Sequence, residues 1–146
     1  MLFVVTRDLS STDEDLAAAY GIDPDILRAL PQGQFTLVNF FRLRDQATDE
    51  AGVGERRSGL EAMMQYARIS GPCLEAAGGR FLTQGIPAGM LWGEDTETWD
   101  VVVVAQYPTG DAFRTLLHDP RYRDAFADRR AAVEEQRVVL SVSIDA

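Results

Sequence analysis

The sequence predicts an α+β fold in which helices cover one face of a four-stranded antiparallel sheet. Three observations lead to this prediction. Residues 35–44 (FTLVNFFRLR) alternate like a strand with two unlike faces. Residues 58–77 carry apolar side chains at helical spacing and are followed by a Gly-Gly stop. Residues 99–130 run from four consecutive valines through a Tyr-Pro corner into a helix that restarts at Asp119-Pro120.

Residues 1–34 are predicted to form an N-terminal helical extension ahead of a single domain over residues 35–146. Ser11 or Thr12 caps a first short helix, and Asp23-Pro24 opens a second. The opening MLFVV fits an edge strand. The extension offers the domain apolar side chains on which to dock: Leu16, Tyr20, Ile26, Leu27 and Leu30.

The elements of the domain follow in the order β-α-β-β-α-β, which is the split βαβ or ferredoxin-like arrangement. We expect a polar loop over residues 45–57 after the first strand, and a kink or restart of the first helix at Pro72. The remaining elements are strands over 80–86 (resuming at 90–92), 99–107 and 137–144, and a second helix in two pieces, 111–117 and 120–135.

One face of the predicted sheet has no helix to cover it. Val38 and Phe40 on the first strand, with Val102 and Val104 on the third, point away from the helix-facing set that includes Asn39. A monomer would expose them as a sizeable apolar patch, which soluble monomers rarely tolerate. The sequence therefore predicts a homodimer joined through its sheets.

Composition restricts the chemistry that is open to this chain. All 14 basic residues are arginines, which excludes a Schiff-base lysine and a P-loop lysine. A net charge of −9 argues against nucleic acid as a partner. One histidine (His118) and one cysteine (Cys73) are too few for a dedicated zinc or Cys-His site. We expect no metal and no other cofactor.

No segment has the character of a membrane span. The apolar runs are all shorter than the roughly 18–20 residues that cross a bilayer. The opening MLFVV is too short for a signal-peptide core, and no basic residue precedes it. We therefore expect a cytoplasmic protein without membrane contact.

A family resemblance is carried by an ordered set of segments: IDPDILRALP, TLVNFFRLRDQA, SGLEAMMQYA, EAAGGRFL, WDVVVVAQYPTGDAF and LLHDPRYRDA. The set, which covers roughly the whole chain, resembles the domain-of-unknown-function family 1330 of the dimeric α/β-barrel (ferredoxin-like) superfamily. The resemblance implies a subunit that pairs its sheet with that of a second copy, and no established activity. Relatives commonly carry a His-Arg pair where this chain has Asp128-Arg129, so no role of that histidine carries over.

Two polar side chains are candidates for a site between the helices and the sheet. Asn39 interrupts an apolar strand face and must find hydrogen-bond partners. It either orients a ligand or water, or bonds a neighbouring side chain or bulged backbone. Tyr66 lies at the edge of the first helix's apolar stripe. Its ring either packs in the core or lets the hydroxyl reach a cavity.

The second helix carries Tyr122, Phe126 and Arg129 at positions i, i+4 and i+7, on one face. This pattern either sets aromatic rings beside a cation, which suits an aromatic or carboxylated ligand, or simply packs the helix. In the second interpretation Arg129 pairs with an acid such as Asp124 or Glu135.

Three more residues are candidates. Arg42, on the strand face opposite Asn39, either binds a carboxylate or forms an ion pair. His118, at the end of a helical piece, is either a general base or is stabilised there by the helix dipole. Trp99 borders an acidic loop, where it either packs in a wall or interface or covers a pocket.

Two functions remain open at this point. The first is a small-molecule-binding protein or cofactor-free enzyme, with a pocket that takes a small organic anion or aromatic molecule. Its ligand-binding candidates are Asn39, Arg42, Tyr66, Tyr122 and Arg129. The second is a non-catalytic dimeric structural or interaction module, which a filled, dry core between helices and sheet would favour. The sequence does not decide whether the protein is an enzyme.

Overall fold

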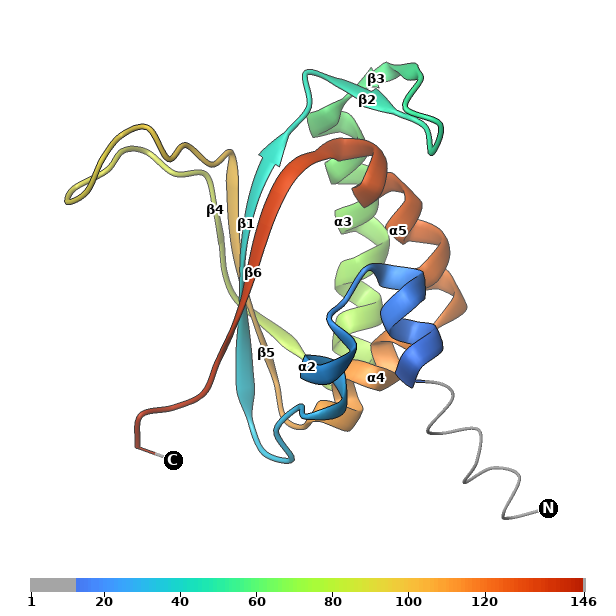
Figure 1. Cartoon of the computed structure of the whole chain (residues 1–146), viewed down its shortest axis with the longest axis vertical. Helices are drawn as coiled ribbons and strands as arrows, with labels where there is room; N and C mark the ends of the chain where they lie inside the picture. The colour runs from blue at the N-terminus through green and yellow to red at the C-terminus, as the bar shows by residue number, and fades with distance from the viewer. Residues whose placement is uncertain (1–12, 146) are drawn as a thin grey trace.

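A computed structural model describes residues 13–145 and has a four-stranded antiparallel sheet with its helices on one face (Figure 1). The strands lie in the order β4-β5-β1-β6. Their bounds are β1 Phe35–Leu43, β4 Arg80–Gly85, β5 Val101–Tyr107 and β6 Val133–Ser141. A helical crossover follows β1 and another follows β5, so the predicted ferredoxin-like fold is confirmed.

Three helices form the layer that covers the sheet: α3 (Gly59–Ala76), α4 (Gly110–His118) and α5 (Pro120–Ala132). The Ser58 side chain caps α3 by accepting from the backbone N–H of Glu61. Asp119 ends α4 and caps α5, with Pro120 in the first turn, as the sequence predicts. Within residues 13–145, no helix combines the length and the apolar content that a bilayer span requires.

Strand alternation divides the sheet into an inner face toward the helices and an outer face without helices. The inner face carries Leu37, Asn39 and Phe41 of β1 opposite Ala105, Val103 and Val101 of β5. The outer face carries Val38 and Phe40 opposite Val104 and Val102, and Val139 of β6 extends the row from Val38. In the single chain these outer-face side chains are only partly covered, since no element of residues 13–145 lies over them.

The N-terminal extension belongs to the same hydrophobic core as the domain. A helix over residues 13–20 ends at Gly21, whose φ of +71° suits glycine, and α2 (Pro24–Arg28) is capped by Asp23. The hydroxyl of Tyr20 donates to the carbonyl of Leu117 over 2.6 Å. The cap predicted at Ser11 or Thr12 and the strand predicted for MLFVV lie outside the described residues.

Two boundaries differ from the prediction. Residues 45–57 hold a short hairpin of β2 (Gln46–Thr48) and β3 (Gly54–Ser58), because the Asp49 side chain closes the turn by accepting from the N–H groups of Ala51 and Val53. Helix α5 ends at Ala132 rather than Glu135, because β6 begins immediately afterwards and its first residue pairs with Leu43.

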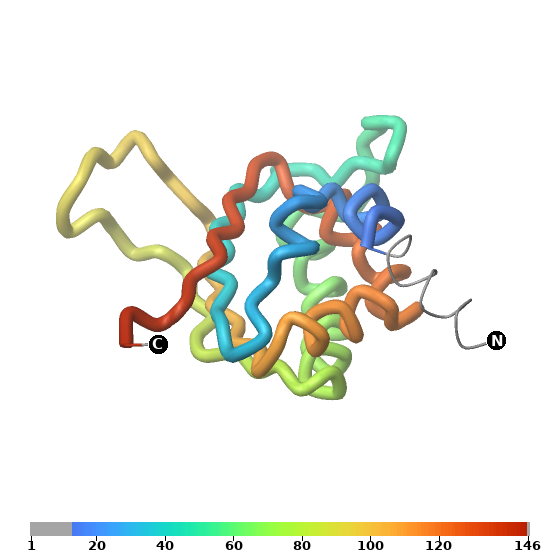
Figure 2. Tube along the Cα trace, turned by 60° about the horizontal axis from the view of Figure 1, so that its bottom comes forward, coloured from blue at the N-terminus to red at the C-terminus, as the bar shows by residue number. Residues whose placement is uncertain are grey.

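Helix α3 continues through Pro72 and does not restart there. One other expectation is wrong. Residues 90–92 do not resume the strand that ends at Gly85. They lie in the long connection between β4 and β5, which extends away from the sheet and has no strand beside it (Figure 2).

Replacing Leu27 by alanine should lower the free energy of unfolding by about 2–5 kcal/mol, because a fully buried leucine leaves a cavity. Its neighbour Ile26 is 49% exposed, so Ile26→Ala should cost about 1 kcal/mol or less. Urea unfolding followed by circular dichroism measures both. Equally small effects would show that the extension does not share the core of the domain.

Candidate functional site

A cavity of about 590 Å³ lies between the inner face of the sheet and the helices. It is bounded by α3 and α5 on one side and by inner-face residues of β1 and β5 on the other. Its volume falls in the range of roughly 300–1,000 Å³ that is common for ligand pockets. Most of its wall is apolar, from β1, β5, α3, α5 and the extension. The space between helices and sheet is therefore not a filled core.

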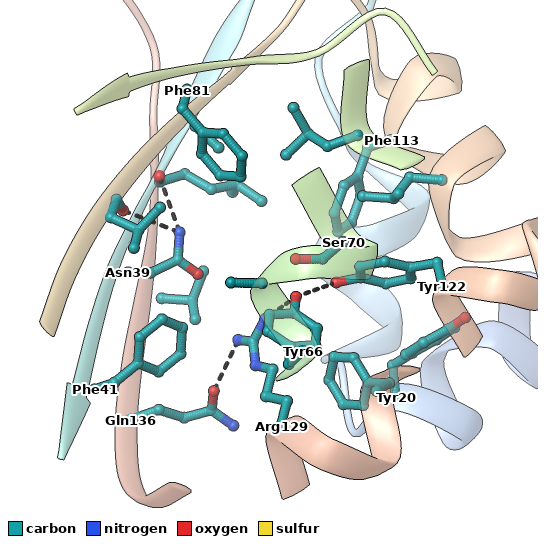
Figure 3. Close-up of a pocket in the computed structure, with 18 of the residues that line it drawn as sticks. Tyr20, Asn39, Phe41, Tyr66, Ser70, Phe81, Phe113, Tyr122, Arg129 and Gln136 are labelled. Carbon is teal, nitrogen blue, oxygen red and sulfur yellow. Dashed lines mark hydrogen bonds between the residues drawn. The ribbon is translucent and has the colours of Figure 1, made fainter. Parts of the chain in front are cut away.

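Four residues singled out from the sequence meet in this cavity (Figure 3). Asn39 enters it from β1, Tyr66 from α3, and Tyr122 and Arg129 from α5. Asn39 and Arg129 are 90 residues apart in the chain, and the ferredoxin-like topology brings their elements, β1 and α5, to the same cavity. Their roles remain predictions, and the geometry below bears on them.

Arg129 is held in place by polar and aromatic neighbours. Its Nη1 donates to the Tyr66 hydroxyl over 3.2 Å, and its Nη2 donates to Oε1 of Gln136 over 2.8 Å. The guanidinium carbon lies 4.8 Å from the ring centre of Phe41 and 5.0 Å from that of Phe126. Its Nε is buried and has no hydrogen-bond partner among the described residues.

No acidic side chain within residues 13–145 forms an ion pair with Arg129. Glu135, one of the acids considered as its partner, binds Arg42 and Arg137 on the outer face. Asp124, the other, is exposed and makes no ion pair in the described part of the chain. Arg129 therefore carries a positive charge into a largely apolar space without a neutralising group, which is costly for a folded protein.

The Tyr66 and Tyr122 hydroxyl oxygens lie 2.9 Å apart and share one hydrogen bond. An arginine can only donate, so the Tyr66 oxygen accepts from Arg129. Two phenol protons serve one O–H···O bond, which leaves one O–H without an acceptor among the described residues. Burial, together with the neighbouring Tyr66, raises the pKa of Tyr122 well above its usual value, so this phenol stays neutral.

Asn39 turns its amide nitrogen toward the sheet. Nδ2 donates to the carbonyls of Leu37 and Val103, over 3.2 and 3.1 Å. These are the backbone bonds of the structural alternative considered above. They leave the amide oxygen directed away from the strand carbonyls and into the cavity (Figure 3), where it offers an acceptor.

Three candidates lie outside the cavity. Strand alternation places Arg42 on the outer face, where it binds Glu135 and the carbonyl of Thr98 and lies 4.9 Å from the Trp99 ring. Trp99 packs beside Phe40 on the same face and covers no part of the cavity. His118 is exposed in the last turn of α4 and does not itself line the cavity.

Asp128 also lies away from the cavity. Its carboxylate accepts from Nη1 of Arg57 over 2.7 Å, and Arg57 also binds Glu55. Asp128 thus takes part in an ion pair that joins α5 to β3. Within the described residues, no group of three or more His, Cys, Asp or Glu side chains is arranged to hold a metal ion.

Two residues of the site were not singled out as candidates. Gln136, which binds Arg129, lies opposite Phe41 on the inner face. A strand starting at Val133 would have placed it there by alternation, but a helix was expected as far as Glu135. Tyr20 was expected only to dock the extension. Its ring packs edge-on against Phe126, with centroids 4.9 Å apart, and forms part of the cavity wall.

The family described as "Domain of unknown function (DUF1330)" matches residues 58–142, which is more than half of the chain. Two crystal structures of the RPA0582 protein, described as a protein of unknown function from Rhodopseudomonas palustris, are 37% and 36% identical to it. Each covers 82% of this chain, over 88% and 90% of its own length, with a TM-score of 0.73. A search of curated proteins finds no match.

The fold recurs in more distant structures. Dimeric ferredoxin-like proteins of unknown function from Bacteroides fragilis and Thermobifida fusca are each 18% identical to this chain, with TM-scores of 0.50. The first covers 77% of this chain and 99% of its own, and the second 75% and 92%. At this identity the likeness concerns the fold.

Replacing Arg129 by methionine should leave the free energy of unfolding unchanged or raise it by about 1–2 kcal/mol, because it removes a partly buried charge that has no counter-charge among the described residues. Arg57→Met is the matched control. It breaks the pairs with Asp128 and Glu55 and should lower stability by about 1 kcal/mol. Urea unfolding without added ligand compares them, and a large loss in the Arg129 variant would mark this residue as structural.

Proposed function

The chain belongs to the DUF1330 family, whose description names no activity, and we propose that it binds a small organic acid in the cavity between helices and sheet. The observation that carries this proposal is that Arg129 has no acidic partner among the described residues and that its buried Nε has no hydrogen-bond acceptor there. A guanidinium has five N–H groups, and only two hydrogen bonds of Arg129 are made within the described chain. A ligand carboxylate would supply the missing charge and accept from the remaining N–H groups.

The hydrogen-bonding inventory around Arg129 supports an acceptor on the ligand. The guanidinium donates, and the Tyr66–Tyr122 pair has one O–H to spare. Both groups would be left unsatisfied by a hydrocarbon, whereas a carboxylate accepts from both. A cation enclosed by the rings of Phe41 and Phe126 is also partly shielded from water, which strengthens its attraction to an anion.

The rest of the cavity supports an apolar or aromatic body for the ligand. Away from Arg129 the wall is built largely from hydrocarbon side chains, among them Met63, Leu74, Phe81, Val103 and Leu140. The amide oxygen of Asn39 interrupts this surface and would accept from a hydroxyl or amino group. The ligand class that satisfies both ends is an aromatic or short-chain carboxylic acid that carries a hydrogen-bond donor.

We also propose that a second copy of the chain covers the outer face of the sheet. Val38, Val104 and Val139 form a row across three strands there, and Val139 is 50% exposed. The two dimeric neighbours that share the fold support this arrangement. The alternative function, a non-catalytic dimeric module, would require only the outer face. It does not account for the charge of Arg129 in the cavity.

The ligand proposal predicts that aromatic carboxylic acids raise the melting temperature in a thermal-shift screen, while the neutral amides of the same acids do not. Arg129→Met should abolish the shift, because the counter-charge is lost. Arg68→Met, at an exposed position on α3, should keep it. Acids and amides acting equally, or an unchanged response in the Arg129 variant, would contradict the proposal.

The dimer proposal predicts that Val104→Glu converts the protein to monomers, because it places an unpaired charge in an apolar interface. Ala127→Glu, at an exposed position of α5 on the opposite side of the molecule, should remain dimeric. Light scattering at micromolar concentration measures the mass of both. A monomeric unmodified protein would remove the proposal altogether.

A further inference from the structure

Residues 86–98, here named the arm, form an unusually apolar connection between β4 and β5. Ile86, Leu91 and Trp92 are 81%, 84% and 86% exposed, and Met90 is 46% exposed. Connections between adjacent antiparallel strands usually have roughly 2–5 residues, and longer ones without secondary structure are commonly functional. Single exposed apolar side chains are ordinary, but several together, including a tryptophan, are typical of an interaction surface.

The arm extends to the side of the sheet that lacks helices. Figures 1 and 2 both show it standing clear of the sheet, and Figure 1 shows the helices on the opposite side. The chain beyond β6 leaves on the same side, with Val142 and Ile144 exposed. The uncovered apolar groups of the arm, the outer face and the C-terminal segment therefore lie on one side of the molecule.

The charges of the arm complement those of the outer face. The arm carries Glu94, Asp95 and Glu97 and no basic residue. The outer face carries Arg80 and Arg137, which β-strand register places beside Gln106 and Phe40. Arg42 lies on the same face, and Glu135, which pairs with both Arg42 and Arg137, leaves the three arginines in excess. Two copies facing each other through their outer faces would bring acidic arms toward basic sheets. An anionic membrane or a nucleic acid would instead meet the acidic residues of the arm and be repelled.

We infer that the arm of one subunit packs on a second copy of this chain, with Leu91 and Trp92 buried against the partner. This inference rests on the proposed homodimer and adds a contact that lies outside the sheet-to-sheet interface. The apolar tip gains from removal of water, and the acidic residues favour the approach of a basic surface. The arm contacts its own subunit only near its two ends within the described chain, where Ile86 borders the cavity and the carbonyl of Thr98 accepts from Arg42. None of its residues belongs to the described hydrophobic core, so its middle part is free to reach beyond the subunit.

Trp92 reports directly on this contact. The chain has two tryptophans, so Trp99→Phe leaves Trp92 as the sole emitter. At micromolar concentration its emission should be blue-shifted, and it should move to the red when Val104→Glu is added to make the protein monomeric. Emission typical of exposed tryptophan in a dimer would overturn the inference.

A second variant tests the energetics in the unmodified background. Leu91→Ala with Trp92→Ala should raise the dimer dissociation constant at least tenfold by sedimentation, without changing the circular dichroism spectrum of the subunit. Thr96→Ala, in the arm but polar, should not. If the double variant dimerises as tightly as the unmodified protein, the arm inference fails and the dimer stands. If the unmodified protein is a monomer, the dimer proposal itself has failed.

Discussion

The packing of α3 against α5 is the constraint on which the rest of the structure depends. The two helices pack against each other, and the cavity lies between this pair and the inner face of the sheet. The aromatic groups of that contact, Tyr66, Tyr122 and Phe126, belong to the buried core and also form part of the cavity wall. The extension completes the enclosure, since Tyr20 packs on Phe126 and donates to Leu117. A small domain thereby gives up burial of apolar area to enclose a site.

Arg129 is the least favourable feature of this arrangement in energetic terms and the most informative in functional terms. A charge in apolar surroundings persists in natural proteins when a function requires it, because stability alone would replace it with a hydrocarbon. The protein's net charge of −9 opposes an approaching anion. That long-range effect fades beyond about 8 Å at physiological salt, whereas the contact with the guanidinium acts at hydrogen-bond distance. The local cation therefore favours an anion as the proposed ligand.

The fold was predictable from local patterns, and the site only in part. Alternation in residues 35–44 and helical spacing in residues 58–77 identify the elements, and these two periodicities survive in the structure as β1 and α3. Spacing on one helix also linked Tyr122 with Arg129. Gln136 was missed because an Arg- and Glu-rich stretch looks helical until its pairing with β1 is known. The distance between the helices and the sheet depends on the side-chain volumes of several elements. The cavity could therefore not be predicted from the pattern of any one segment.

The alternation of a strand also separates the two proposed functions at the level of neighbouring residues. On β1, Asn39 faces the cavity while Val38 and Phe40 face the side proposed for a second copy. On β6, Gln136 binds Arg129 while Arg137 lies on the outer face beside Trp99. Because successive side chains of a strand point to opposite faces, the two surfaces of the sheet can carry different chemistry. Ligand binding and association are therefore separable by substitution at adjacent positions, and a shift of register by one residue would destroy both at once.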